Sequence, residues 1–239
     1  MTDDSQSNLP GAGRRLVVAL DGPGSSGKST VGAEAASRLG YRFCDTGLLY
    51  RGVAWLALER GVRPTDVAAL VPLATEITLV ADSRGRLSQV RADGRDVTTE
   101  VTGGAVDRAV SDYAKVPQLR AALMPRQRSI AATGGIIMAG RDIGTVILPD
   151  ADVKLYINAS AEARAGRRAR QRGATDGADA ERILEDLRRR DSIDSSRETA
   201  PLRIATDATV IDTDSIDFEE TVRAVVETIH RAEAGAHGR

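Results

Sequence analysis

Residues 22–30 combine glycines, a lysine and hydroxyls at a spacing that suits phosphate binding. Gly22, Gly27, Lys28 and Ser29 occupy the fixed positions of the pattern G-x-x-x-x-G-K-S, and a β-branched apolar run precedes them. Glycines let the backbone approach phosphates closely, so that successive N–H groups and the positive end of a following helix face the anion. Lys28 can then reach the β and γ phosphates, and the Ser29 hydroxyl can ligate Mg²⁺. The residues predicted to bind a nucleoside triphosphate are Gly22, Pro23, Gly24, Ser25, Ser26, Gly27, Lys28, Ser29 and Thr30.

The composition excludes several other kinds of chemistry and partner. The only cysteine is Cys44, which rules out an internal disulfide, and no apolar stretch approaches the roughly 20 residues of a membrane helix. We therefore expect a soluble, cytoplasmic protein without a membrane partner. The formal net charge of −1 gives no overall attraction to nucleic acid. His230 and His237 lie far from the glycine loop, which argues against histidine acid–base catalysis but not against phosphoryl transfer, since that relies on Mg²⁺, Lys and Arg.

Alternating apolar runs and helical patterns predict a doubly wound α/β fold with a parallel sheet. The expected strands are 16–20, 41–44, 136–139, 153–157 and 208–211, and the expected helices are 28–39, 48–60, 66–74, 104–115, 117–132, 161–172, 178–190 and 216–232. Residues 77–101 interrupt this rhythm with a small antiparallel insertion. Pro125 predicts a kink or break in its helix, and residues 173–179 resemble a hinge or mobile tip. Residues 1–13 are expected to be a disordered tail and 233–239 a loose one.

Three charged or polar clusters follow the predicted strands and helices. Residues 45–51 (DTGLLYR) open a helix after a strand, residues 140–145 (GRDIGT) end another strand, and residues 188–197 carry four arginines and two aspartates. A doubly wound sheet places binding groups at the carboxyl ends of its strands. By pattern alone the first cluster could equally be a helix cap, and the second a solvated ion pair. The third could be a solvated helix face or, together with Arg164, Arg167 and Arg168, a flap that brings arginines to phosphates.

In sequence order, these strings together resemble the bacterial cytidylate kinase family. They are the glycine loop, DTG…YR at 45–51, GRDV at 94–97, RQR at 126–128, GRDIGTV at 140–146, RD…D…R at 190–197 and PL at 201–202. Each string alone is weak, but the ordered set spans residues 16 to about 230. The resemblance implies a P-loop kinase fold with an antiparallel insertion in the part that binds the acceptor nucleotide, and a helical lid. It also implies one kinase domain, 14–232, with a core (14–44, 105–160 and 200–232), an acceptor-binding part (45–104) and a lid (161–199).

The activity implied by the resemblance is transfer of phosphate from ATP to CMP or dCMP with Mg²⁺, by a monomer. The acceptor nucleotide would contact Thr46, Tyr50, Arg51, Ser111, Arg120, Arg141, Asp142, Arg190, Asp194 and Arg197. The catalytic residues would be Lys28, Arg141, Asp142, Arg190 and Arg197. Arg164 and Arg168 would close over ATP, and Ser29 would hold the metal. No general base is required, because the attacking group is an anionic phosphate oxygen.

The chain also departs from the family pattern. Ala139 stands where the family usually has an acidic residue, which would help to hold Mg²⁺ through its water shell, and either Asp21 or Asp142 could compensate. Val101-Thr102 replaces an Ile-Arg pair. The alternatives are therefore a catalytically impaired nucleotide-binding homologue or a P-loop kinase of another nucleoside monophosphate. A GTPase is disfavoured because the chain contains no Asn-Lys-x-Asp motif for guanine.

Overall fold

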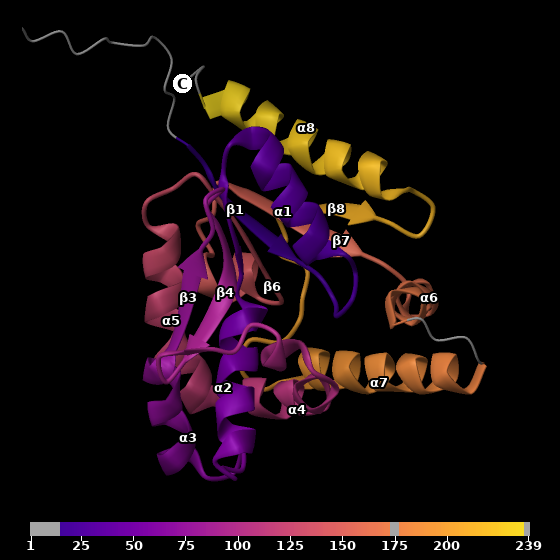
Figure 1. Ribbon diagram of the computed structural model, residues 1–239. Coiled ribbons are helices and arrows are strands. Elements are labelled where there is room, and N and C mark those ends of the chain that lie inside the picture. The colour runs from indigo at the N-terminus through magenta and orange to yellow at the C-terminus, as the bar shows by residue number, and fades with distance from the viewer. Residues whose placement is uncertain (1–14, 173–176, 237–239) are drawn as a thin grey trace, which may run out of the picture.

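The computed structural model describes residues 15–172 and 177–236 and consists of one sheet with helices on both faces (Figure 1). The strands are β1 (Val17–Asp21), β2 (Arg42–Asp45), β3 (Ile77–Ala81), β4 (Arg86–Ala92), β5 (Arg95–Asp96), β6 (Ile136–Gly140), β7 (Val153–Asn158) and β8 (Thr209–Asp212). The α-helices are α1 (Lys28–Leu39), α2 (Gly47–Glu59), α3 (Val67–Leu73), α4 (Gly104–Ala114), α5 (Pro117–Ala131), α6 (Ala161–Arg172), α7 (Gly177–Ser196) and α8 (Phe218–Ala236). No helix within the described ranges is both long and apolar enough to cross a membrane.

The sheet has the order β3-β4-β2-β6-β1-β7-β8, with β5 added beside β4. Strands β4, β2, β6, β1, β7 and β8 are mutually parallel, whereas β3 and β5 run antiparallel to β4. The predicted doubly wound fold is confirmed. The antiparallel insertion is not a separate unit, because the register pairs Phe43 with Arg86 and Cys44 with Leu87, so that β4 extends the parallel core.

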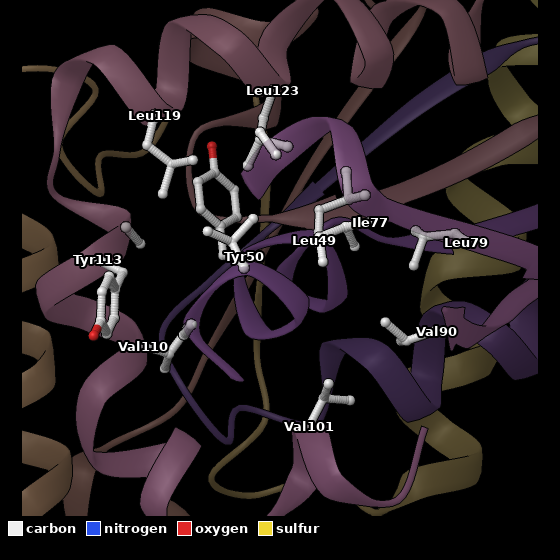
Figure 2. Packing of buried hydrophobic residues seen from close by; sticks show 14 of the residues in the cluster. Leu49, Tyr50, Ile77, Leu79, Val90, Val101, Val110, Tyr113, Leu119 and Leu123 are labelled. Atoms are coloured by element: carbon white, nitrogen blue, oxygen red, sulfur yellow. The ribbon is translucent and has the colours of Figure 1, made fainter. Parts of the chain in front are cut away.

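Apolar clusters cover both faces of the sheet, which explains why its central strands are uniformly apolar. Ile136 and Met138 of β6 belong to the cluster under α2 and α5, whereas Ile137 and Ala139 belong to the cluster under α1 and α8. Figure 2 shows part of the first cluster, in which Tyr50 packs with side chains of α5. Because both faces are buried, the carboxyl ends of the parallel strands are held in a fixed arrangement.

The glycine loop fits into a narrow space between β1 and α1. A Cβ on Gly22 would lie 2.4 Å from the Ile157 carbonyl oxygen of β7, so only glycine lets the loop pass there. Gly27 has φ +92°, which glycine tolerates, and α1 begins at the next residue, Lys28. The loop therefore ends with the helix N-terminus directed at its hollow, as the sequence predicts.

Several predicted boundaries are wrong. Helix α7 continues to Ser196 rather than ending at 190, and α8 continues to Ala236, so residues 233–236 are helical and not a loose tail. Helix α5 runs unbroken through Pro125, and a π-helix at Ile143–Ile147 was not predicted. The predicted tail at 1–13 lies outside the described residues, as do residues 173–176 of the predicted hinge; α7 begins at Gly177.

A glycine sets how closely α1 packs on the sheet. A Cβ on Gly32 would lie 2.6 Å from the Phe43 ring and 2.8 Å from Leu20. We expect Gly32→Ala to lower the free energy of unfolding by about 1–3 kcal/mol, because both neighbours are buried and must move. Gly235→Ala in α8, where a Cβ meets no atom within 4 Å, should cause no loss. Urea titration of both variants tests this, and equal stability would mean that α1 can shift freely.

Candidate active site

A cavity of about 880 Å³ lies at the carboxyl ends of the parallel strands. Its walls come from the glycine loop, α2, α4, α5, α6, α7 and the start of α8. The predicted site residues that line it are Ser25, Ser26, Gly27, Lys28, Ser29, Thr30, Thr46, Tyr50, Arg51, Ser111, Arg120, Arg141, Asp142, Arg168, Arg190, Asp194 and Arg197. Gly22, Pro23 and Gly24 are buried behind this lining. The fold thus brings the separate motifs of the sequence to one place.

The cavity carries a strong excess of positive charge. Its cationic side chains are Lys28, Arg51, Arg120, Arg141, Arg167, Arg168, Arg170, Arg190 and Arg197, whereas its carboxylates are Asp45, Asp142, Asp194, Asp214 and Asp217. Like charges gathered at low dielectric repel one another and attract anions. The cavity is therefore suited to a polyanionic ligand.

The glycine loop presents a buried lysine and an unsatisfied hydroxyl. Lys28 donates to the Pro23 carbonyl oxygen at 3.0 Å. Burial lowers the pKa of Lys28 well below its usual value, and Arg141 lowers it further. The buried Ser26 Oγ has no hydrogen-bond partner within the described residues. Both groups could donate hydrogen bonds to the oxygens of a phosphate held by the loop.

Arg190 and Arg141 lie close to the glycine loop at Gly24. A Cβ on Gly24 would lie 3.4 Å from Arg141 Nη2 and 3.8 Å from Arg190 Nη2. Arg190 makes no hydrogen bond or ion pair with any described residue, and its Nε is buried. Burial lowers the pKa of Arg190 to about 10, with Arg141 and Arg51 contributing. A buried cation without a partner is costly, so this guanidinium needs an anion close to Gly24.

Ion pairs fix the deeper wall of the cavity. Arg120 donates to Asp142 Oδ2 at 2.5 Å and to the Ala114 carbonyl at 3.1 Å, and both charged side chains are buried. The guanidinium carbon of Arg120 also lies 5.3 Å from the ring centroid of Tyr50. Because Arg120 is held from three sides, it can offer its remaining donors in a defined direction.

Asp194 organises two further arginines. It accepts a hydrogen bond from Arg141 Nε at 3.0 Å and another from Arg197. Burial would raise the pKa of Asp194, but Arg141 and Arg197 outweigh it and hold that pKa below its usual value. The carboxylate is therefore charged and orients both guanidiniums.

The two arginines expected to close over ATP lie in different surroundings. Arg164 does not line the cavity; it is buried and donates to the carbonyls of Gly24 at 2.9 Å and Ala159 at 3.0 Å, and to Asp191 Oδ1 at 3.1 Å. Arg164 thus braces the back of the glycine loop. Arg168 lines the cavity and donates to Asp107 Oδ2 at 2.5 Å.

Two carboxylates near the loop have distinct partners. Asp21 accepts hydrogen bonds from the amides of Ile143 and Gly144, both at 2.8 Å, and so fixes the π-helix. Asp45 accepts from Ser29 Oγ at 2.5 Å, next to Ala139 in the strand register. The sequence offered Asp21 and Asp142 as substitutes for an acid at position 139, but both are engaged elsewhere. The place of Asp45 at the end of a strand predicts by itself only a helix cap, so the sequence does not indicate this contact with Ser29.

Comparison with known proteins gives consistent matches over nearly the whole chain. A family model described as cytidylate kinase matches residues 18–231. The cytidylate kinase of Geobacillus kaustophilus is 45% identical over 220 residues, which cover 91% of this chain and 97% of that protein. The cytidylate kinase of Nocardia farcinica is 44% identical over 209 residues, covering 87% and 90% of the two chains.

The environment of Asp21 predicts a pH effect on stability. Burial raises its pKa from 3.8 to about 6, although the amides of Gly144 and Ile143 lower it. The folded protein thus holds this proton more tightly than the unfolded chain, so the stabilisation is complete below pH 3.8 and is lost as pH rises through 6. Relative to Asp21→Asn, the wild type should lose about 2 kcal/mol between pH 4 and pH 7. Denaturant titrations of both proteins at the two pH values measure this, and a constant difference would contradict it.

Proposed function

The chain belongs to the cytidylate kinase family, and on this premise we propose that it transfers the terminal phosphate of ATP to CMP and dCMP. The products are ADP with CDP or dCDP. The observation that carries the proposal is the buried Arg190, which pairs with no described residue and lies beside Arg141 and Gly24. This pair of guanidiniums lies between the glycine loop and the deeper wall of the cavity, where a phosphate passing from donor to acceptor would need positive charge.

The donor nucleotide binds along the glycine loop. Backbone amides of the loop and the N-terminus of α1 face its phosphates, and Lys28 contributes a charge at the same place. Arg167 of α6 donates to the Ser26 carbonyl of the loop at 3.3 Å, and Arg168 lines the same cavity. Because Arg164 is occupied with the carbonyls of Gly24 and Ala159, it supports the donor site from behind rather than contacting the nucleotide.

The acceptor nucleotide binds in the deeper part of the cavity. Ser111, Arg120 and Tyr50 surround the pyrimidine, and Asp194 and Arg197 contact the sugar. Thr46, Arg51, Arg141, Asp142 and Arg190 complete the acceptor site around its phosphate. Arg141 and Arg190 hold both reacting phosphates in line and offset the repulsion between them, which is most of what phosphoryl transfer demands of a protein.

Mg²⁺ fits the residues at the start of α1. Ser29 Oγ is a hard oxygen ligand that donates to Asp45, and Asp45 forms no ion pair with a described residue. The described residues hold no cluster of three or more His, Cys, Asp or Glu, which agrees with an ion that keeps most of its waters. Ser29 would ligate the ion and Asp45 would hold its water shell. The ion would neutralise charge on the transferred phosphate.

The proposal also covers the cellular compartment and the oligomeric state of the enzyme. The single cysteine, Cys44, is buried, and burial raises its pKa to about 12, so the thiol stays protonated and unreactive. We infer a monomer that works in the reducing cytoplasm. Its partners are then the two nucleotides alone.

An ADP-release assay tests the activity. With ATP and Mg²⁺, we expect turnover with CMP and dCMP and little with UMP, AMP or GMP. Lys28→Ala should reduce turnover at least about 100-fold, because one preorganised charge at the reacting phosphate is lost. The variant must show wild-type thermal unfolding for this comparison to be valid. If the protein binds ATP but releases no ADP with any acceptor, the proposed activity is refuted.

The role of Asp45 gives a separate prediction. We expect Asp45→Asn to weaken Mg²⁺-dependent ATP binding by about tenfold, because the amide holds the water shell less well. ATP binding in EDTA should be unchanged. Asp214→Asn, which removes a carboxylate from the same cavity but not from Ser29, is the matched control. Calorimetric titration with and without Mg²⁺ measures both, and equal losses in the two conditions would contradict a role at the metal.

A further inference from the structure

Asp107 joins the acceptor-binding part to the α6–α7 pair. It lies in the first turn of α4, and its side chain is only 8% exposed. Its Oδ1 accepts from Arg51 Nη2 of α2 at 2.6 Å, and its Oδ2 accepts from Arg168 Nη2 of α6 at 2.5 Å. One carboxylate thus holds two arginines that are 117 positions apart in the sequence.

The two arginines belong to opposite ends of the proposed reaction. Arg51 lies on the acceptor side and is also anchored to the Val101 carbonyl at 3.0 Å. Arg168 lies on α6, which closes the donor side. Helix α4 packs against both α2 and α7, so Asp107 is placed where these parts meet (Figure 1). A contact at this position resists separation of the α6–α7 pair from the acceptor-binding part.

The charges around Asp107 show why an anion is needed there. Arg51, Arg168 and Arg190 line the same cavity, and the charges of all three act on Asp107. Burial would raise the pKa of Asp107, but Arg51 and Arg168 lower it below its usual value, so the group is charged at neutral pH.

We propose that Asp107 takes the place of a substrate phosphate: it holds Arg51 and Arg168 together in the nucleotide-free enzyme and gives them up to the incoming phosphates. The proposal rests on the function proposed above. Asp107 then has two effects, one on the position of the α6–α7 pair and one on the affinity for phosphate. The carboxylate keeps the α6–α7 lid closed when the site is empty, and the same negative charge opposes phosphate binding.

The variant Asp107→Asn distinguishes the proposed role from a simpler one, in which Asp107 only orients Arg51. The amide has nearly the same shape but neither the charge nor a second acceptor atom. We expect CMP to bind about threefold to tenfold more tightly, because one like charge near the phosphate is removed. If Asp107 merely orients Arg51, CMP binding must weaken instead.

The position of the lid is measured without any nucleotide. Donor and acceptor dyes at Arg63→Cys and Arg182→Cys, both exposed sites, report the distance between the α2–α3 connection and α7. Buried Cys44 should not take up label. We expect Asp107→Asn to lengthen the mean distance in the free enzyme, and Asp107→Glu, which keeps the charge, to restore most of the closure.

Asp112→Asn provides the matched control. It removes a carboxylate from the same helix, and within the described residues Asp112 forms its ion pair with exposed Lys115. Neither CMP affinity nor lid distance should change. Unchanged or weaker CMP binding in Asp107→Asn, or an unchanged lid distance, would each overturn the proposal. A wild type that does not bind CMP would refute the proposed function instead, while the lid measurement in the free enzyme would still stand.

Discussion

Burial of positive charge is the constraint on which the rest of this structure depends. A cavity that must bind phosphates needs guanidinium groups withdrawn from water, and each withdrawn cation is costly without a partner. Asp142, Asp194 and Asp107 each offset this cost by forming ion pairs with one or two arginines. Arg190 makes no ion pair or hydrogen bond with any described residue, and it lies beside Gly24 of the loop. The pattern of satisfied and unsatisfied cations therefore marks where the substrate must supply charge.

The backbone around the loop is fixed by a second set of contacts that never face the substrate. Asp21 ties the π-helix to the end of β1, and Arg164 ties α6 to the Gly24 carbonyl. Arginine suits this task because its planar fork can donate to Gly24, Ala159 and Asp191 at once, which a single ammonium could not do with fixed geometry. Displacement of α6 would then also disturb the loop, so the glycine loop and α6 are mechanically connected.

The sequence predicts the fold well where local signals and burial agree. The limits of α1 follow from Gly27 before it and Gly40 after it, and the apolar runs of β1 and β6 follow from burial on both faces. Helix α7 extends past its predicted end because Asp194 is held by Arg141 and Arg197, contacts that outweigh the weak helix propensity of its Asp and Ser residues. The π-helix depends on Asp21, more than 120 positions away, and no local pattern could reveal it.

Which residues gather at the site was predictable, but their individual partners were not. Arg164 and Arg168 are one helical turn apart and look equivalent in the sequence; a rotation of about 40° around the helix axis separates them. That difference directs Arg164 to the loop backbone and Arg168 to Asp107. Asp45 and Ala139 are likewise register neighbours on β2 and β6, and only this pairing shows that a carboxylate is present beside Ser29 although position 139 has none. In a site built from several strand ends, a carboxylate on one strand can take the place of a carboxylate on the neighbouring strand. The absence of an acidic residue from one motif therefore does not establish that the site lacks that charge.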